Sequence, residues 1–321
     1  ESDSPADPLD RPSGDEPFCE PDPSQGLDPS ADGPGTEHQY VPVRRGGVDS
    51  EGKLRSGKLA GLSMAAAIWV LSWPVVLESF LNSLVGLTDT VLAANLENGE
   101  PATDAIGGAS YFMWFIGLAI MALGVGATAL VSRSVGKGRT AVANTVVGQC
   151  VTLGVIIGLL VGSTIAALSG HIADWLSLSE EATVLFRRYL FIISIGAPFQ
   201  AVLFTLIACA RGAGDSKRPL LAMTVRNLVN IVVSYLLCGV ALELPGFLGG
   251  GTLENPSPVA LGVAGLAIGT VVGDIAGMLI VVGMARSGIW GIRLRARRLK
   301  LHLVTVWRRQ RQGVPNFFET L

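Results

Sequence analysis

Cysteine is scarce in this sequence, and its placement argues against two kinds of stabilising site. The four cysteines are Cys19, Cys150, Cys209 and Cys238, and no two of them form a CxxC pair. Disulfide frameworks and zinc sites use regularly spaced cysteines, so neither is expected here, and no metal or organic cofactor is predicted. Three of the four lie in apolar stretches, where an isolated thiol acts as a small packing residue.

Large apolar residues are nearly absent from the first part of the chain. Half of the acidic residues and just over half of the prolines precede Lys53. This composition cannot bury enough surface to offset the entropy of ordering, so residues 1–58 are expected to be a disordered, acidic, proline-rich tail. The tail also lacks the basic start and apolar centre of a secretory signal peptide.

The rest of the chain contains long apolar blocks with few charges. Each of six blocks exceeds the roughly 18 residues that a membrane-spanning helix needs. We therefore expect an all-α integral membrane protein with a six-helix transmembrane bundle over residues 59–285. A seventh block begins near Leu303. The six predicted spans are Ala67–Asn95, Ile106–Arg133, Ala141–Leu168, Phe186–Arg211, Pro219–Leu242 and Val259–Ala285.

Basic and acidic residues alternate between the predicted connections. Lys and Arg gather before the first span and in the second, fourth and sixth connections, whereas the other three connections are mainly acidic. The positive-inside rule then predicts a multi-pass protein of the plasma membrane (the inner membrane in a cell with two) with a cytoplasmic N-terminus. Residues 286–321 are expected to form a basic cytoplasmic connection and the start of a seventh helix. Trp307 is the single aromatic residue between Arg293 and Arg311, too few for an interleaved pattern, so the partner of this basic run is expected to be the lipid bilayer rather than nucleic acid.

Two further patterns concern helix packing and internal repetition. Glycines recur every four residues in the third and sixth spans, which puts them on one helix face where backbones can approach closely. Pro74 and Glu78 in the first span recur with the same spacing as Pro315 and Glu319 in the seventh block. Repeated bundles of spans are typical of secondary transporters, so the echo predicts a second repeat that begins at the seventh helix.

Ionisable residues inside a span are costly and are usually functional or paired. This chain has four in the predicted spans: Glu78, Asp89, Arg226 and Asp274. A buried carboxylate can exchange a proton or bind a sodium ion, and either reaction can couple an ion gradient to a conformational change. The alternative is that these groups only pair with one another or with backbone. We favour that alternative for Arg226, whose long side chain is able to extend toward the membrane interface.

Polar residues share helix faces with these groups and are expected to line a cavity. In the first span, Glu78 and Asp89 are almost three turns apart and therefore lie on one face. Proline lacks an N–H group and bends a helix, so Pro74 predicts a bend at the start of this span. The stripes are Pro74, Glu78, Asn82 and Asp89 in the first span, Asn227, Asn230 and Ser234 in the fifth, and Thr270 with Asp274 in the sixth.

The order of these motifs resembles the multidrug and toxic compound extrusion (MATE) family. The resemblance extends over roughly Ser63 to Leu321 and rests on five motifs in sequence. They are Pro74 with Glu78 and Gly86-Leu-Thr-Asp89-Thr90, then Gly124-Val-Gly126, then Ala210-Arg211-Gly212-Ala-Gly214-Asp215, then Leu228-Val-Asn230-Ile, and finally Gly262-Val-Ala-Gly265.

The resemblance implies one lobe of a twelve-helix secondary antiporter that exports organic cations or other amphipathic small molecules in exchange for protons or sodium ions. It implies that Asp89 and Asn230 form the ion-coupling site, with Thr270 as a further ligand. Many members of the family carry an Asp one turn after the Asn of the fifth helix, where this chain has Ser234. The departure puts the coupling ion in doubt. The missing partner would be the C-terminal lobe of the same protein.

Two other functions are compatible with a polytopic chain. A flippase of a lipid-linked precursor would share the fold, but it would favour a cavity rich in basic residues. An intramembrane enzyme would need a catalytic set, yet His38, His171 and His302 all lie outside the spans. Asp89 and Asp274 have no protease motif around them. A secondary transporter, and not an enzyme, is therefore the expected class.

Overall fold

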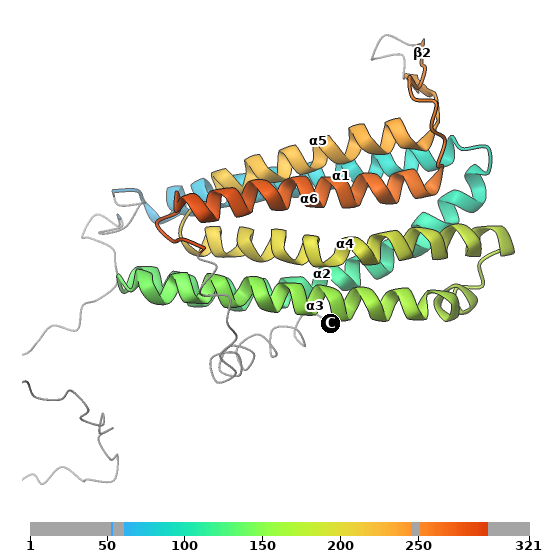
Figure 1. Ribbon diagram of the computed structural model, residues 1–321. Helices are drawn as coiled ribbons and strands as arrows, with labels where there is room; N and C mark the ends of the chain where they lie inside the picture. The colour runs from blue at the N-terminus through green and yellow to red at the C-terminus, as the bar shows by residue number, and fades with distance from the viewer. Residues whose placement is uncertain (1–52, 54–60, 245–250, 295–321) are drawn as a thin grey trace, which may run out of the picture. The chain divides into compact units, whose positions relative to one another are not determined.

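The computed structural model describes residues 53, 61–244 and 251–294, and this part of the chain is almost entirely helical (Figure 1). Its six helices are each long and apolar enough to cross a membrane, which confirms the predicted number of spans. The helices are α1 (Met64–Ala94), α2 (Gly99–Gly136), α3 (Thr140–Trp175), α4 (Glu180–Gly212), α5 (Lys217–Cys238) and α6 (Val263–Ser287).

Several helices extend beyond the apolar blocks that predicted them. The α2 helix has 38 residues and begins at Gly99, seven residues before the predicted start. At ~1.5 Å per residue it is about 57 Å long, well above the ~30 Å of a hydrocarbon core. The extensions carry polar residues. A hydropathy pattern marks only the apolar, membrane-embedded part of a helix, so it did not detect these ends. Serine side chains cap two helices: Ser63 accepts from the Ala66 N–H at the start of α1, and Ser179 accepts from the Ala182 N–H at the start of α4.

The connection between α5 and α6 differs from the prediction. The fifth span was predicted to reach Leu242, but α5 ends at Cys238 and Gly239 follows with φ 79°. Glycine adopts this left-handed conformation without steric cost and so ends the helix there. Two short antiparallel strands follow, β1 (Leu242–Leu244) and β2 (Gly251–Leu253), and the sixth span begins at Val263 rather than Val259.

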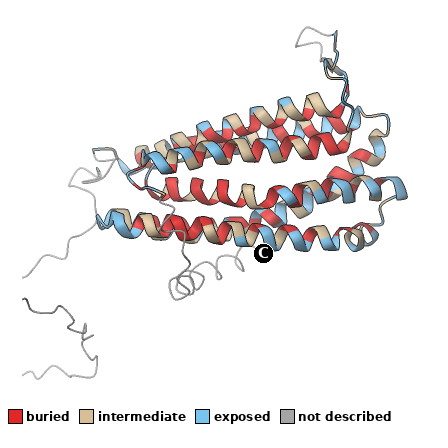
Figure 2. Cartoon of the chain, viewed as in Figure 1, coloured by how far each residue is buried: buried red, intermediate tan, exposed pale blue. Residues whose placement is uncertain are grey.

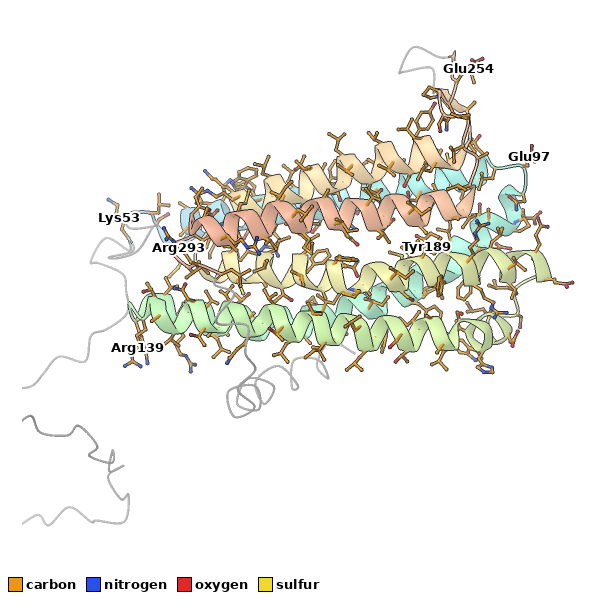
Figure 3. The ribbon with its side chains drawn as sticks, viewed as in Figure 1. Lys53, Glu97, Arg139, Tyr189, Glu254 and Arg293 are labelled. Carbon is orange, nitrogen blue, oxygen red and sulfur yellow. The ribbon has the colours of Figure 1, made fainter. Side chains whose placement is uncertain are left out.

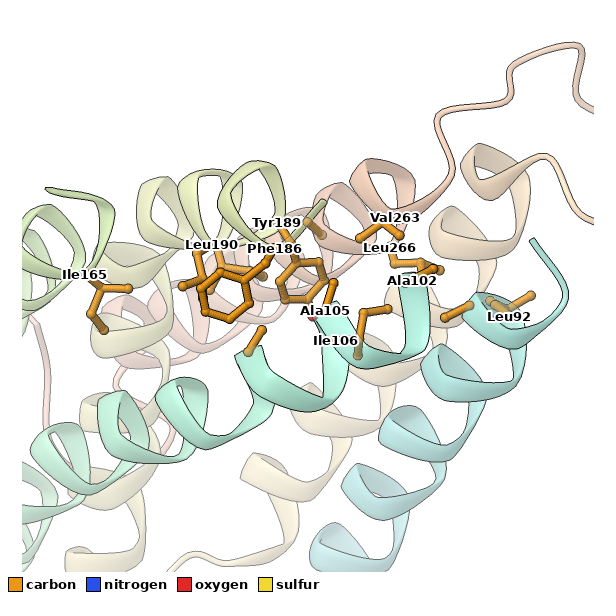
Figure 4. Packing of buried hydrophobic residues seen from close by; sticks show 14 of the residues in the cluster. Leu92, Ala102, Ala105, Ile106, Ile165, Phe186, Tyr189, Leu190, Val263 and Leu266 are labelled. Carbon is orange, nitrogen blue, oxygen red and sulfur yellow. The ribbon is translucent and has the colours of Figure 1, made fainter. Parts of the chain in front are cut away.

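The α4 helix lies at the centre of the bundle. It packs against α2, α3 and α6, while α5 packs against α6 and α1. Over its most apolar stretch 56% of α4 residues are buried, compared with 17% for α1, so α1 exposes far more of its surface. Figure 2 shows buried residues on the inward faces of the helices. Figure 4 shows one of the two apolar clusters, in which Phe186 and Leu190 of α4 meet Ala105 and Ile106 of α2.

The glycine stripes lie where helices touch, which confirms their predicted packing role. A Cβ atom placed on Gly158 of α3 would lie 2.6 Å from the Cα atom of Pro198 in α4. One placed on Gly265 of α6 would lie 2.6 Å from the carbonyl carbon of Leu237 in α5. Both distances are too short for a side chain, so in these two helix pairs backbone packs directly against backbone.

Charge separates along the bundle. In Figure 3, Lys53, Arg139 and Arg293 lie at one end, and Glu97 and Glu254 lie at the other. This separation agrees with the alternation seen in the sequence. The tail at residues 1–52, most of the basic connection and the seventh block lie outside the described residues, so the predicted boundaries at residues 58 and 286 remain predictions.

Candidate functional site

The polar stripe of α1 faces the interior of the bundle. Pro74, Glu78 and Asp89 are buried, and Asn82 is partly buried. This follows from their spacing, because residues separated by whole turns share one helix face. Glu78 forms an ion pair with Arg211 at the end of α4. Glu78 is thus neutralised by a neighbouring helix.

A second ion pair lies between α5 and α6. The Nε atom of Arg226 donates to Asp274 at 2.8 Å, and both side chains are more than nine-tenths buried. The Nη1 atom of Arg226 also donates to Asn227 at 2.9 Å and to Asn82 of α1 at 3.3 Å. Arg226 therefore does not extend to the membrane interface. Instead it joins three helices and neutralises Asp274.

A hydrogen-bonded group of four residues begins one turn after Arg226 on α5 and one turn before Asp274 on α6. The Asn230 side-chain amide donates to the Thr270 hydroxyl at 2.9 Å, and that hydroxyl donates to the Leu266 carbonyl at 3.2 Å. Ser234 donates to the same carbonyl at 3.4 Å and neighbours the Asp89 carboxyl group. Asn230 and Ser234 have no solvent exposure. The predicted polar faces of α5 and α6 thus pack against each other.

A cavity of about 390 Å³ opens between the helices beside these groups. Three of the residues predicted to line such a cavity do so: Asn82, Asp89 and Thr270. The other predicted residues are buried but are not among the residues that line it: Pro74, Glu78, Asn227, Asn230, Ser234 and Asp274. Asn82, Val85, Gly86, Asp89, Thr90, Thr103, Ile106, Gly107, Ser110, Met113, Tyr189, Phe204, Arg226 and Thr270 line the cavity.

Two oxygen atoms at this site have no hydrogen-bond donor. They are Oδ1 of Asp89 and Oδ1 of Asn230, both buried. Buried polar atoms without partners are rare in proteins and call for an explanation. Both atoms are acceptors, so a proton or a small cation would satisfy them. Among the described residues around the cavity, Asp89 is the carboxylate that no ion pair neutralises.

Some residues of the site were not predicted from the sequence. Tyr189 of α4 is almost fully buried, lines the cavity, and donates through its hydroxyl group to the Met113 sulfur at 3.6 Å. Thr103 and Ser110 of α2 also line the cavity. Each of these residues is a single polar group in an apolar helix, so no periodic stripe marks it. The only sign of a polar face on α2 in the sequence is the seven-residue spacing of Thr103 and Ser110, which puts them on one side of the helix.

Comparison with known proteins identifies the family. The profile described as MatE matches residues 74–236, which is half of the chain. The chain belongs to the MatE family. The matched region runs from Pro74 of α1 to the polar face of α5 and so contains Asp89, Arg226 and Asn230. Thr270 and Asp274 lie beyond it.

Individual relatives of this MatE chain are distant in sequence. It is 22% identical to the probable multidrug resistance protein NorM of Thermotoga maritima, over 64% of this chain and 41% of that protein. It is 24% identical to the multidrug export protein MepA of Staphylococcus aureus, over 71% of this chain and 47% of the relative. The chain therefore spans about half the length of the curated relatives it matches.

Solved structures also match this chain over about half of their own length. A crystal structure of MATE in the bent conformation superimposes with a TM-score of 0.66 at 21% identity, over 79% of this chain and 52% of the other. The six helices therefore have the fold of one lobe of a MATE transporter. The family consists of multi-pass, ion-coupled secondary transporters, so the intramembrane-enzyme alternative is set aside.

Proposed function

We propose that this chain forms the ion-coupling lobe of an antiporter that exports organic cations or other amphipathic compounds in exchange for protons or sodium ions. The observation that carries the proposal is the carboxylate of Asp89. It is buried, faces a cavity, has no ion-pair partner among the described residues, and has one oxygen without a hydrogen bond.

Asp89, Asn230 and Thr270 are assigned distinct roles. Asp89 supplies the negative charge that a coupling cation neutralises. Asn230 supplies a second free oxygen, and its amide is oriented by its 2.9 Å hydrogen bond to Thr270. Carboxylate, amide and hydroxyl oxygens are the ligands that hard cations prefer. A proton on Asp89 would neutralise the same charge, so the arrangement suits either coupling ion.

The charge of the cavity favours an exporter of cations over a flippase of an anionic lipid-linked precursor. Arg226 is the basic residue in the cavity wall, and Asp274 neutralises it at 2.8 Å. The remaining charge in the wall is that of Asp89. A cavity with this balance attracts cations and repels a phosphate group.

The proposed orientation puts the N-terminus in the cytoplasm of a cell bounded by its plasma membrane. Its support is the separation of charge, with Lys53, Arg139 and Arg293 at one end of the bundle. Basic residues remain on the cytoplasmic side during insertion. The acidic end, with Glu97 and Glu254, would then face outward.

The test is cation binding by the purified protein in detergent. Asp89→Asn preserves the shape of the side chain and removes its charge, so binding of radioactive sodium, or dye-reported proton uptake, should fall at least tenfold. Asp104→Asn is the matched control, because Asp104 is an exposed carboxylate on α2 outside the cavity. Ser234→Ala should have a smaller effect than Asp89→Asn, since a hydroxyl carries no charge.

The outcome against the proposal is equally specific. If Asp89→Asn binds sodium and protons as the unmodified protein does, Asp89 is structural. Glu78 or Asp274 would then become the leading candidate for ion coupling. The same variants, assayed for efflux of a fluorescent organic cation under an imposed gradient in a transporter that contains both lobes, extend the test from binding to transport.

A further inference from the structure

Three charged groups lie close together in the bundle, but they play unequal parts in the cavity. Asp89 and Arg226 both line the cavity, whereas Asp274 is not among the lining residues and accepts a hydrogen bond from Arg226. The Arg226 side chain also contacts Asn82, which lies two turns before Asp89 on α1. Seven residues of helix correspond to about 10 Å, so the Arg226 charge lies within electrostatic range of Asp89.

The balance of charge among these groups decides what binds at Asp89. Arg226 carries one positive charge, and Asp89 and Asp274 can carry one negative charge each. With Arg226 committed to Asp274, the cluster holds one uncompensated negative charge and takes up one monovalent cation. The Glu78–Arg211 pair is neutral in itself and does not alter this balance.

We propose that Asp274 is a positioning residue that holds Arg226 away from Asp89 and so prevents Arg226 from acting as its built-in counter-ion. This inference rests on the proposed function of Asp89 as the cation site. It also assigns Asp274 a role other than cation ligand, because Asp274 forms an ion pair with Arg226 and is not among the residues that line the cavity.

The packing of α6 explains why Arg226 is available for this role. A Cβ atom on Gly277 would lie 2.9 Å from the Arg226 Cβ atom, and one on Gly273 would lie 2.8 Å from the Arg226 carbonyl oxygen. The base of the Arg226 side chain is thus pressed against α6, beside Asp274. If Asp274 loses its charge, the guanidinium group becomes an unpaired buried cation, and Asp89 is the unpaired carboxylate in the same cavity wall.

The consequence is a set of opposite effects in single variants that cancel in the double variant. In Asp274→Asn the free guanidinium competes with the cation at Asp89. For unit charges about 10 Å apart at an effective dielectric constant of about 20, cation affinity should fall roughly tenfold or more. In Arg226→Met the negative charge of Asp274 is no longer compensated and adds to that of Asp89, so cation affinity at Asp89 should rise by a similar factor. The double variant removes a neutral pair and should bind one cation, with an affinity within about threefold of the original.

The experiment measures sodium binding with the radioactive ion, and proton uptake with a pH-indicator dye, for the whole chain in detergent. Asp89→Asn is included in every series. Weak binding by Asp274→Asn with recovery in the Arg226→Met/Asp274→Asn double variant supports the proposal. A double variant that remains as weak as Asp274→Asn overturns it, because Asp274 would then be a cation ligand. An Asp274→Asn variant that binds normally overturns it too.

Two further comparisons keep the result interpretable. If Asp89→Asn binds cations normally, the proposed function itself fails. If Asp89→Asn loses binding while Asp274→Asn retains it, only the present inference fails. If a single variant does not fold, the double variant can still be tested, because replacing a buried ion pair with neutral residues usually preserves stability. Weak cation binding by the folded double variant would overturn the proposal. Recovery of binding in the double variant is a readout that a merely structural role of Asp274 would not produce.

Discussion

Replacing Gly273 of α6 with alanine tests whether helix packing sets the geometry of the polar site. A Cβ atom at this position would lie 2.8 Å from the Arg226 carbonyl oxygen, 3.0 Å from the Asn230 Cβ atom and 3.3 Å from the Asn230 nitrogen. The first of these atoms belongs to the backbone and cannot rotate away. The methyl group must therefore push α5 from α6 at the point where Asn230 meets Thr270.

The size of the effect follows from two opposing contributions. Overpacking a tight interface costs roughly 1–3 kcal/mol. Replacing glycine by alanine in a helix otherwise stabilises the folded state by about 0.5–1 kcal/mol. We expect a net destabilisation of about 1–2 kcal/mol, and roughly 2–4 °C of lowered unfolding midpoint per kcal/mol on the scale of soluble domains of similar size. Gly283 lies in the same helix, and a Cβ atom added there would have no neighbouring atom within 4 Å, so Gly283→Ala should be neutral or stabilising.

The assay is thermal unfolding of the purified protein in detergent, followed by sodium binding of the variant that remains folded. Gly273→Ala should lower both the midpoint and the cation affinity, because displacement of Asn230 disturbs its hydrogen bond to Thr270. Gly283→Ala should lower neither. Equal midpoints for the two variants would refute the close approach of α5 and α6 on which this reasoning depends.

Two other predictions concern topology and the need for a second lobe. An impermeant maleimide should label the exposed cysteine of Glu97→Cys from outside the cell and that of Lys137→Cys only from inside. The reason is that acidic connections are expected outside and basic connections inside. The reverse pattern would contradict the proposed orientation. Reconstituted alone in vesicles, the 321-residue chain should not drive gradient-dependent efflux of an organic cation, because alternating access moves one repeat against another. Robust efflux by chains shown by cross-linking to be monomeric would contradict that expectation.

The sequence predicted the spans because they depend on the length of an apolar block, and it predicted the inward faces because they depend on periodicity along one helix. Asn82 and Asp89 are seven residues apart, and that spacing alone puts them on one face, whatever the neighbouring helices are. The glycine stripe of α6 was predictable for the same reason. These features require no knowledge of how one helix is rotated against another.

The pairing between helices could not be predicted in the same way. The contacts of Glu78 with Arg211 and of Arg226 with Asp274 join residues 133 and 48 positions apart. Which carboxylate meets which arginine depends on the relative rotation and depth of four helices. Without that knowledge Arg226 was expected to extend toward the interface, and Asp274 was a candidate ligand. The structure instead pairs them, because a buried guanidinium is far more stable beside a carboxylate than unpaired in an apolar bundle.

The turn between α5 and α6 was missed for a local reason. Val240, Ala241 and Leu242 continue an apolar run, so hydropathy alone extends the fifth span beyond Cys238. The clue was Gly239, whose positive φ ends the helix. A glycine near the end of an apolar block has two interpretations, close packing or a helix end, and only its neighbours in space distinguish them.

Several of the close contacts between α5 and α6 occur at polar residues of α5. The glycines at 269, 273 and 277 of α6 face Ser234, Asn230 and Arg226 of α5 in the same order. The close contact between these glycines and α5 sets the distance between the two helices, and so it sets the positions of the backbone atoms that carry the Asn230 and Arg226 side chains. Of the two ionic residues that line the cavity, Arg226 forms an ion pair with Asp274, and Asp89 has no ion-pair partner among the described residues. On the proposal that Asp89 is the cation site, this single unneutralised carboxylate takes up one monovalent cation, and that change of charge couples the ion gradient to movement of the lobe.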